Sequence, residues 1–477
     1  MSQSSKSLLS DIRIYLLLFF LVRLIGITNP PLETGHNWRQ TTVTMVARNF
    51  LEVDNNILYP RIDIAGEKTG ITGMEFPLLN YLIYIISELF GYEHWYGRLI
   101  NLIISSLGVF YFFKLIKRFF TERTALYASI ILLASIWFSF SRKIMPDTFA
   151  VSLVIIAFYQ GLRYIYDNDS KSRKSRLFLL LLFGILGMLS KLPCGYLFVL
   201  FLIPLFDSTV GLQRKLNLVL TGFFIAIPVG IWYFYWVPHL VAEFGFWHYF
   251  MGISISEGWS QVQGHWGETM SRFYDDALKF IGFSVFIASL IALVLKKRYL
   301  PLIMLGLASL GFAVIILKAG RTFYHHNYYI IPFVPIMAFI AGYGLSLIKK
   351  TWIVISILTA IILEGTINQA HDFRIKEKYS GLIQLEDDLD KFTNAEDLIL
   401  INSGDYPTPM YFAHRSGWVA SNERIQDVGY LDSLGNKGLK AIVILKKTFG
   451  NEIAIEENQI IDNEDYSIYL LGETIIN

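Results

Sequence analysis

Long apolar segments, separated by short polar ones, run through most of the chain. Ten of them are close to the roughly 20 apolar residues that a transmembrane helix needs, at 97–116, 124–140, 147–166, 177–190, 195–210, 217–236, 278–295, 300–317, 328–348 and 351–366. An earlier run, 14–27, is as short as 177–190 but extendable at both ends. Only helices and closed barrels satisfy their backbone polar groups in lipid. The pattern therefore predicts a polytopic α-helical membrane protein.

The run 76–91 (FPLLNYLIYIISELFG) is ambiguous, because its length suits either a short span or a helix lying along the membrane surface. Loop charge decides between the two. If 76–91 does not span, the basic clusters that begin at Arg173 and Lys296 both fall inside, as the positive-inside rule requires. We therefore expect about eleven spans, with 29–96 and everything after about 367 extracytoplasmic.

The first outer loop has helical periodicity of its own. Val43, Met45, Val46, Phe50 and Leu51 form roughly one apolar face within 38–51. Together with 76–91, this predicts two helices on the membrane surface. A second outer loop, 237–277, is rich in aromatic residues and glycine, which is typical of lids and binding surfaces.

The pattern changes near the C-terminus. Charged and polar residues dominate from about 370, interrupted by apolar runs at 398–401 (LILI), 441–445 (AIVIL) and 467–471 (SIYLL). Helical patterns lie between these runs, so we predict a small extracytoplasmic α/β domain. The expected division is a membrane domain, 1–366, which includes the outer loop 29–96, and a C-terminal domain, 367–477.

Composition agrees with a membrane protein. Hydrophobic residues make up 54% of the chain and charged residues 17%, against about 25% charged in typical soluble domains. The net charge of +2 gives no indication of nucleic-acid binding, and the single cysteine, Cys194, excludes an internal disulfide. The first apolar run lacks a small-residue cleavage site and ends in Pro30-Pro31, so we expect a retained helix rather than a signal peptide.

The polar stretch 30–40 directly follows this first run. It places Glu33, His36, Trp38 and Arg39 close to a membrane exit. Ionisable groups at such a place are costly and commonly functional. We therefore interpret 30–40 as the core of an active site.

The predicted topology places many further polar groups on the same outer face. They are Asp63, Glu75, Arg98, Arg142, Lys143, Asp147, Lys191, Lys318, Arg321, Tyr324, His325 and His326. The inner loops hold mainly Lys and Arg, with scattered acids and no histidine. Carboxylates and histidines gathered on one side indicate one extracytoplasmic catalytic cavity.

Each candidate also has a structural reading. Asp147 follows Pro146 at a helix start, where a carboxylate complements the helix dipole. Lys191 suits an interfacial anchor, and His325 and His326 precede an aromatic-belt pattern. Metal-ligand spacing of the H-x-x-x-H kind is absent, so no cofactor is assigned and dependence on a divalent metal stays open.

Several blocks resemble one enzyme class. They are GHNWRQTTVTMVARNF, YPRID, GMEFPLLNYL, SRKIMPDTFA, LSKLPCG and HHNYYIIPFVPIMAF, spread over about residues 12–366. In this order they resemble glycosyltransferases of the GT-C superfamily, specifically the family 39-like enzymes that use polyprenyl-phosphate sugars. These include dolichyl- and polyprenyl-phosphate-sugar mannosyltransferases and aminoarabinose transferases. The resemblance implies a GT-C-like fold.

The resemblance also implies roles for particular residues. Such enzymes carry an acid in the first outer loop, often an Asp-Glu pair shortly before an arginine and an aromatic residue. Aligning Arg39 with that arginine puts His36 and Asn37 where the acidic pair would stand, which is a departure. The catalytic base therefore stays open between His36, Glu33, Asp63 and Asp147.

The lipid phosphate has its own candidates. The basic residue that precedes the corresponding helix in aminoarabinose transferases falls near Glu75, another departure. The remaining candidates are Arg98, Arg142, Lys191, Lys318 and Arg321.

The implied function is that of a membrane-bound inverting glycosyltransferase, a hexosyl- or pentosyltransferase. It would move a sugar from an undecaprenyl- or other polyprenyl-phosphate donor to an extracytoplasmic glycan, lipid or protein acceptor. The expected setting is the bacterial plasma membrane, in lipopolysaccharide and cell-envelope synthesis or protein glycosylation. The leaving phosphate needs cations, which arginine supplies, and the acceptor needs a general base.

Two other classes of protein are compatible with parts of the pattern. A transporter or flippase of lipid-linked saccharides would place charges near the bilayer midplane and would show repeated, broken helices. No internal repeat is seen. A scaffold that binds through its C-terminal domain is the third reading.

Overall fold

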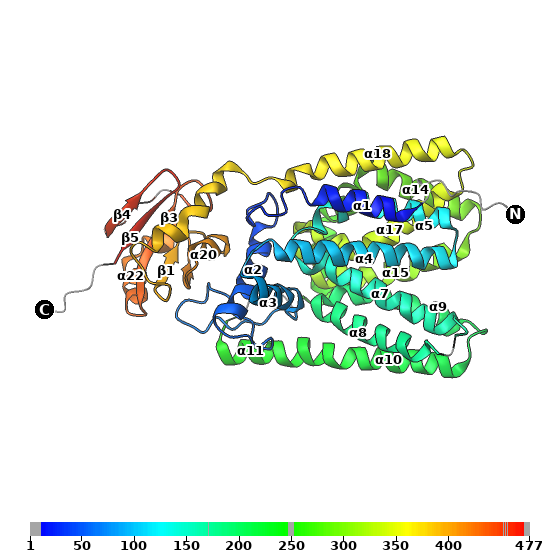
Figure 1. Cartoon of the computed structure of the whole chain (residues 1–477), viewed down its shortest axis with the longest axis horizontal. Coiled ribbons are helices and arrows are strands. Elements are labelled where there is room, and N and C mark those ends of the chain that lie inside the picture. The colour runs from blue at the N-terminus through cyan, green and yellow to red at the C-terminus, as the bar shows by residue number, and fades with distance from the viewer. Residues whose placement is uncertain are drawn as a thin grey trace. The chain divides into compact units, whose positions relative to one another are not determined.

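The computed structural model describes residues 11–169, 171–246, 252–451, 453, 455 and 457–471. Residues 247–251 of the expected second outer loop lie outside this description. The chain divides into two compact units (Figure 1). Unit 1 comprises Met1–Ile27, Arg98–Tyr235 and Phe250–His371, and unit 2 comprises Thr28–Gly97, Trp236–Tyr249 and Asp372–Asn477.

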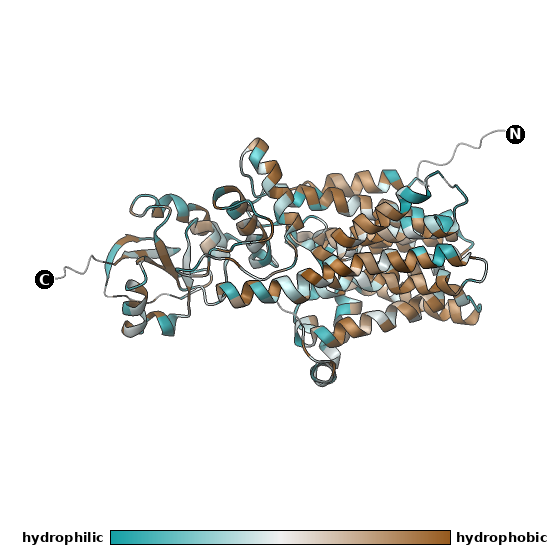
Figure 2. Cartoon of the chain, turned by 90° about the horizontal axis from the view of Figure 1, so that it is seen from below, coloured by the Kyte–Doolittle hydropathy of each residue, from teal (hydrophilic) through white to brown (hydrophobic). Residues whose placement is uncertain are grey.

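Unit 1 is helical, and hydrophobic residues dominate its helices (Figure 2). Its α-helices are α1 (Ile12–Arg23), α4 (Tyr96–Phe119), α5 (Glu122–Ala134), α6 (Trp137–Phe140), α7 (Pro146–Tyr166), α8 (Arg173–Ser190), α9 (Leu202–Phe206), α10 (Leu212–Ile231), α12 (Ile255–Gly264), α13 (Trp266–Ser271), α14 (Lys279–Leu295), α15 (Tyr299–Ala319), α16 (Arg321–His325), α17 (Val334–Ser346) and α18 (Thr351–Gln369). The 3₁₀ segments η2 (Leu192–Phe201) and η5 (Asn327–Phe333) precede α9 and α17, and the π-helical segments η3 (Trp232–Trp236) and η4 (Arg272–Ala277) follow α10 and α13.

Within the described residues, six helices are long and apolar enough to cross a membrane: Tyr96–Phe119, Pro146–Tyr166, Leu212–Phe244, Tyr299–Ala319, Asn327–Ser346 and Thr351–Phe373. A seventh follows if Trp266–Ala277 and Lys279–Leu295, bent by 100°, count as one span. The expected spans at 14–27, 124–140, 177–190 and 195–210 fall on shorter, broken or more polar helices. The total of about eleven therefore stays a prediction.

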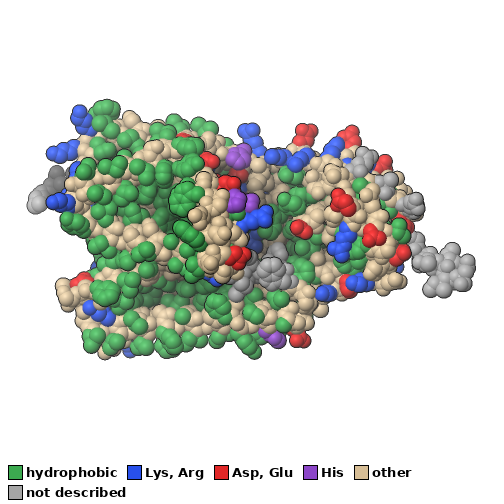
Figure 3. All heavy atoms as spheres, turned by 180° about the vertical axis from the view of Figure 1, so that it is seen from behind, with side chains coloured by type: hydrophobic (Ala, Val, Ile, Leu, Met, Phe, Trp, Pro, Cys, Tyr) green, Lys and Arg blue, Asp and Glu red, His purple; other side chains and the backbone are tan. Residues whose placement is uncertain are grey.

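On the face seen in Figure 3, exposed hydrophobic side chains are gathered over the helical unit 1. On α10, Val219, Leu220, Phe223 and Phe224 are all more than half exposed. A soluble monomer rarely exposes apolar patches of this extent. The surface is the one expected of helices that face lipid.

A single serine explains why the predicted segment 124–140 is two helices. The Ser135 hydroxyl donates to the Leu132 carbonyl at 2.6 Å and accepts from the Trp137 amide at 3.2 Å. Such local bonds compete with the helical ladder. Consequently α5 ends at Ala134, and the short helix α6 begins at Trp137.

Small residues bring helices of unit 1 into close contact. A Cβ added to Gly187 of α8 would lie 2.8 Å from a Val154 methyl group of α7, and one added to Gly342 of α17 would lie 2.3 Å from the Ala128 amide nitrogen of α5. Helix pairs in membranes use small residues in this way because their backbones can then approach closely.

Unit 2 combines helices with a five-stranded sheet. The helices are α2 (Asn37–Glu52), α3 (Leu78–Phe90), α11 (Val237–Phe244), α19 (Leu385–Leu389), α20 (Thr408–Ala413), α21 (Asn422–Ile425), α22 (Val428–Gly435) and the 3₁₀ segment η7 (Glu377–Gln384). A further 3₁₀ turn, η6 (Ala370–Phe373), lies at the boundary of the two units. The strands are β1 (Leu398–Ile401), β2 (Gly417–Val419), β3 (Leu439–Leu445), β4 (Asn458–Asp462) and β5 (Tyr466–Leu470).

The sheet is mixed, with strand order β2-β1-β3-β5-β4. Strand β1 pairs parallel with β2 and β3, whereas β5 pairs antiparallel with β3 and β4. The three apolar runs predicted at 398–401, 441–445 and 467–471 coincide with β1, β3 and β5. The short strands β2 and β4 were not anticipated.

Side chains alternate between the two faces of the sheet, as strand geometry requires. Leu400, Ile442 and Ile444 pack with residues of α21 and α22 on one face. On the other face, Ile399 and Val443 pack in a core that also contains residues of α2, α3, α19 and α20. The loop that the sequence analysis grouped with the membrane domain therefore shares a core with the C-terminal segment.

Candidate functional site

The polar stretch 30–40 lies in unit 2 and leads into α2. Glu33 is fully buried and forms a backbone bridge with Ile375, while the Thr34 amide donates to the Arg374 carbonyl at 3.2 Å. His36 precedes the helix in a left-handed conformation, with a φ of 60°. Non-glycine residues in this region are uncommon and are often found at functional sites.

Arg39 and Glu75 come together from distant points of the first outer loop. Their side chains form an ion pair, and only 11% and 10% of the two side chains are exposed. The Arg39 guanidinium also lies 6.0 Å from the centre of the Trp38 ring. Helix α3 is fastened to α2 nearby, because the Asn80 amide donates to the Val43 carbonyl at 2.9 Å. Three candidate residues thus form one cluster, which we call the arginine-39 cluster.

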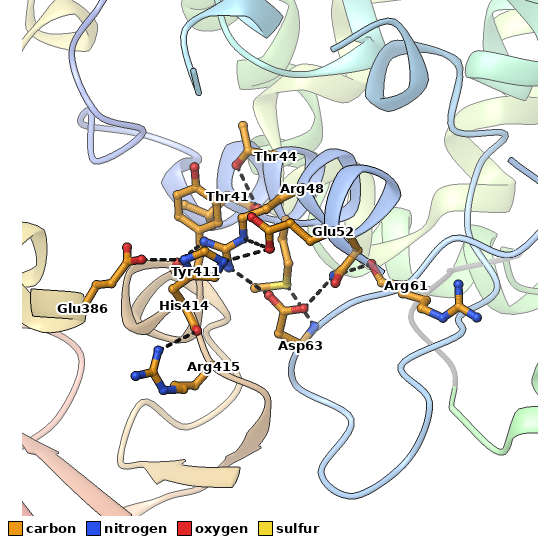
Figure 4. Close-up of polar contacts among 12 residues, drawn as sticks. Thr41, Thr44, Arg48, Glu52, Arg61, Asp63, Glu386, Tyr411, His414 and Arg415 are labelled. Carbon is orange, nitrogen blue, oxygen red and sulfur yellow. Dashed lines mark hydrogen bonds and ion pairs between the residues drawn. The ribbon is translucent and has the colours of Figure 1, made fainter. Parts of the chain in front are cut away.

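Asp63 belongs to a different network, at the other end of α2 (Figure 4). Its carboxylate pairs with Arg48 at 3.1 Å and accepts from the Asn49 amide at 2.6 Å. Arg48 lies about 14 Å along the helix from Arg39. Burial raises the pKa of Asp63, and the adjacent Arg48 opposes this rise. The structure therefore separates Asp63 from the arginine-39 cluster.

His414 joins the Asp63 network and was not predicted (Figure 4). Its Nδ1 lies 2.5 Å from a Glu386 carboxylate oxygen, and its Nε2 lies 2.8 Å from one of Glu52. These two hydrogen bonds raise the pKa of His414 to about 9. The charged imidazole links α2 to α19 and α20, which is a structural contribution.

In unit 1, Asp147 and Lys191 form a second candidate site. Asp147 lies in the first turn of α7 and Lys191 directly follows α8, and their Oδ1 and Nζ atoms are 2.7 Å apart. The Lys191 Nζ lies 4.9 Å from the Tyr328 ring centre and 5.5 Å from that of Tyr329. His326 stacks on Tyr328 at 5.3 Å. We call these residues the lysine-191 cluster.

Asn101 of α4 positions the loop that carries Asp147. Its amide nitrogen donates to the carbonyls of Phe140, Lys143 and Met145 at 3.0, 2.8 and 3.2 Å. Its oxygen accepts from the Thr148 hydroxyl at 3.1 Å. Asn101 was not among the residues predicted from the sequence, although a lone amide in an apolar run was the available signal.

Arg98 and Arg142 are buried and contact the backbone after α1. They donate to the carbonyls of Ile27 and Gly26, respectively, each at 2.9 Å. Carbonyls that follow a helix lack intrahelical donors, and basic side chains often satisfy them. These contacts show the two arginines stabilising the exit of the first helix.

The remaining candidates lie at α15 and α16. Arg321 Nε donates to His325 Nε2 at 2.9 Å, and Tyr324 stacks on His265 at 4.5 Å. Lys318 is exposed, and its carbonyl accepts from the Ile253 amide at 2.9 Å. These residues fasten part of the second outer loop to the end of α15.

The two clusters offer cations, carboxylates and imidazoles in largely buried settings. Such groups suit anion binding and proton transfer. In the part of the chain that the structure describes, no group of three or more His, Cys, Asp or Glu side chains is arranged to hold a metal ion.

Comparison with known proteins gives one family match and several structural matches. Residues 75–232 match the model of the family described as dolichyl-phosphate-mannose-protein mannosyltransferase. This segment includes Glu75, Arg98, Arg142, Asp147 and Lys191. A search of curated proteins finds no match.

The structural matches extend over nearly the whole chain. ArnT from Cupriavidus metallidurans in the apo state is 14% identical, with a TM-score of 0.63, and the match covers 96% of this chain and 98% of that one. ArnT bound to undecaprenyl phosphate is 13% identical, with a TM-score of 0.62 and the same coverage. The oligosaccharyltransferase AglB from Archaeoglobus fulgidus, with an inhibitory peptide and a dolichol-phosphate, is 12% identical, with a TM-score of 0.53, covering 91% of this chain and 70% of that one.

At these identities the structures establish the fold, which is the fold shared by ArnT and AglB. The chain is thus similar to the mannosyltransferase family over 75–232, and over nearly its whole length it has the fold of ArnT and AglB.

Proposed function

We propose that the protein is a membrane-bound inverting glycosyltransferase that uses a polyprenyl-phosphate sugar. The observation that carries the proposal is the mannosyltransferase-family match over 75–232, which contains both residues of the Asp147–Lys191 pair. Related folds have been determined with undecaprenyl phosphate in ArnT and with a dolichol-phosphate in AglB. The basic clusters near Arg173 and Lys296 support an orientation with the first outer loop outside the cytoplasm.

The reaction forms a bond between the acceptor oxygen or nitrogen and the anomeric carbon. It breaks the bond from that carbon to the phosphate oxygen, on the opposite face, and thereby inverts the configuration. The phosphate leaves as an anion, so it needs positive charge rather than a proton. The acceptor's proton passes to a general base.

Lys191 is the proposed phosphate ligand. Its ammonium lies against two tyrosine rings and pairs with Asp147, a carboxylate that is 2% exposed. A bound phosphate would compete with Asp147 for this cation. A largely buried cation stabilises developing negative charge more strongly than one in water.

The proposed base is His36, with Glu33 as the competing candidate in the same stretch. Two of the other carboxylates already have cationic partners, since Glu75 pairs with Arg39 and Asp63 with Arg48. An imidazole is also the side chain best suited to accept a proton near neutral pH. We assign Asp63 to the stability of unit 2 rather than to catalysis.

The test is an assay of sugar transfer in which release of polyprenyl phosphate is measured by mass spectrometry. Lys191→Gln, Asp147→Asn and His36→Ala should each lower the rate by about 100-fold or more at matched expression, the size seen when one charge-stabilising group is removed. Asp207→Asn is the control, because that carboxylate bonds Tyr166 and Thr209 near the far end of α7.

Different outcomes have different meanings. A low rate in Glu33→Gln but not in His36→Ala would move the base to Glu33. Near-wild-type transfer rates in Lys191→Gln, Asp147→Asn, His36→Ala and Glu33→Gln alike would refute the site assignment. Movement of the lipid-linked sugar across the membrane without release of polyprenyl phosphate would refute the transferase and indicate a flippase.

A further inference from the structure

A large apolar cavity lies inside unit 1, and neither Asp147 nor Lys191 lines it. Side chains from α4, α7, η2, α9, α15 and α17 line it, and it holds about 900 Å³ of empty space when its opening is included. The lining is aliphatic and aromatic, and Tyr166 is the one residue in it with a hydroxyl group.

The cavity has the depth of one membrane leaflet. Along α7 it is lined by Ile155, Phe158, Leu162 and Tyr166, which lie on one face of the helix. The first and the last are eleven positions apart, which gives a rise of about 16 Å along the helix. The hydrocarbon core of a bilayer is about 30 Å thick, so the cavity matches about half of it. An extended acyl chain fits this depth.

Several arginines gather at one end of the cavity. Phe119 and Tyr166 form this end and pack edge to face at 5.6 Å. The next residue after Tyr166, Asp167, is paired with three arginines at once: Arg118, Arg163 at 3.0 Å and Arg176 at 2.8 Å.

Positive charge exceeds negative charge here even when further acids are included. Asp169 lies 3.5 Å from Arg176, and Asp207 accepts from the Tyr166 hydroxyl at 3.1 Å. Arg214 adds a fourth guanidinium, which donates to the Ile165 carbonyl at 2.5 Å.

These arginines retain capacity for another anion. About a third of the Arg118 and Arg163 side chains is exposed, at 35% and 32%. Arg176 is 3% exposed, and its Nε has no hydrogen-bond partner among the residues that the structure describes. Basic pockets between transmembrane helices commonly bind anionic lipid head groups.

We propose that unit 1 binds an anionic phospholipid, with one acyl chain in this cavity and its phosphate at Arg118 and Arg163. The site differs from the proposed reaction site. The cavity residue on α7 nearest in sequence to Asp147 is Ile155, about 12 Å from Asp147 along the helix. Asp167, where the arginines gather, lies about 30 Å from Asp147. A phosphate at the arginines is therefore not the reacting one, and the proposal does not depend on the proposed function.

The test uses the full-length protein, delipidated in detergent and then supplied with phosphatidylglycerol or phosphatidylcholine. Retained lipid is measured by native mass spectrometry. Wild type should retain one phosphatidylglycerol at collision energies that remove phosphatidylcholine. The double variant Arg118→Gln/Arg163→Gln should lower this retention at least tenfold, because it removes the charges at the phosphate.

A second variant tests the cavity itself. Leu162→Trp places a large ring in the acyl-chain position and should lower retention of both lipids. Ile203→Phe repeats the test from α9, in case the first variant folds poorly. The control is Lys349→Gln/Lys350→Gln, which removes the same charge from two exposed positions between α17 and α18 and should bind like wild type.

Three results would overturn the proposal. One is equal retention of phosphatidylglycerol and phosphatidylcholine by wild type. Another is wild-type retention of phosphatidylglycerol by the double arginine variant. The third is displacement of bound phosphatidylglycerol by equimolar polyprenyl phosphate, which would assign the cavity to the isoprenoid chain instead.

Discussion

His414 lies between Glu52 and Glu386, and replacing it with glutamine should make the stability of unit 2 less dependent on pH (Figure 4). The pKa of His414 rises from 6.5 to about 9 in the folded protein. For a fully buried group, a shift of this size corresponds to roughly 3 kcal/mol of stability. His414 keeps 34% of its side chain exposed, so solvent screening reduces the expected contribution to about 1.5 kcal/mol.

The direction of this pH dependence follows from the linkage between protonation of His414 and folding. The folded-state pKa is raised, so the stabilisation is fully present below pH 6.5 and is lost as the pH rises through about 9. Wild-type unit 2 should therefore weaken by about 1.5 kcal/mol between about pH 6 and about pH 10, relative to His414→Gln. In a domain of this size, that change lowers the midpoint of thermal unfolding by roughly 3–6 °C.

The assay is the temperature at which the C-terminal segment of the detergent-solubilised, full-length protein becomes sensitive to protease. Other groups titrate over the same range, so the quantity of interest is the difference between wild type and His414→Gln at each pH. Glu386→Gln should remove part of the same difference, because the hydrogen bond that His414 donates to Glu386 is the largest cause of the pKa shift. Identical pH dependence in wild type and His414→Gln would refute the reasoning.

Two further predictions concern stability. Arg48→Met should destabilise unit 2 by about 3–5 kcal/mol, since it leaves Asp63 buried without its cation. This loss of stability should be smaller at low pH, because the raised pKa of Asp63 lets its carboxyl group become neutral there. Protease sensitivity measures the loss, and a value below about 1 kcal/mol at neutral pH would contradict the prediction. Gly342→Ala should destabilise unit 1 by about 1–3 kcal/mol, because its methyl group meets the α5 backbone, whereas Gly306→Ala, with nothing within 4 Å, should not. The readout is the temperature at which buried Cys194, the only cysteine, reacts with a fluorescent maleimide, and equal midpoints for the two alanine variants would count against the packing argument.

Periodicity predicted much of the local structure. The apolar face within 38–51 and the run 76–91 coincide with α2 and α3, and three short apolar runs coincide with strands. These patterns depend on neighbours in sequence, which fix helices and strands directly. Strand β2 was missed because GWV is too short to show alternation.

The candidate site was only partly predictable. Glu75 and Arg39 were both candidates, yet nothing in a spacing of 36 residues indicates that they form a pair. Asn101 and His414 act through partners brought near by folding, so their sequence neighbours carry little information. The charges of the loops predicted that the candidate residues share the extracytoplasmic face. The specific partners of Asp63, Arg98 and Arg142 could not be predicted in this way, because they depend on tertiary packing.

The shared core of unit 2 has a consequence for synthesis. Met45, Val46 and Phe50 of α2 pack with Leu385 and Ile399, residues that a ribosome adds more than 300 positions later. At about 5–20 residues per second, the first outer loop waits roughly 15–70 s before its apolar face can be covered. During that interval the membrane surface or a holding chaperone must shield α2. A nonsense mutation in the C-terminal segment would therefore leave a membrane-inserted helical bundle with a permanently uncovered outer loop, a ready substrate for quality-control proteases.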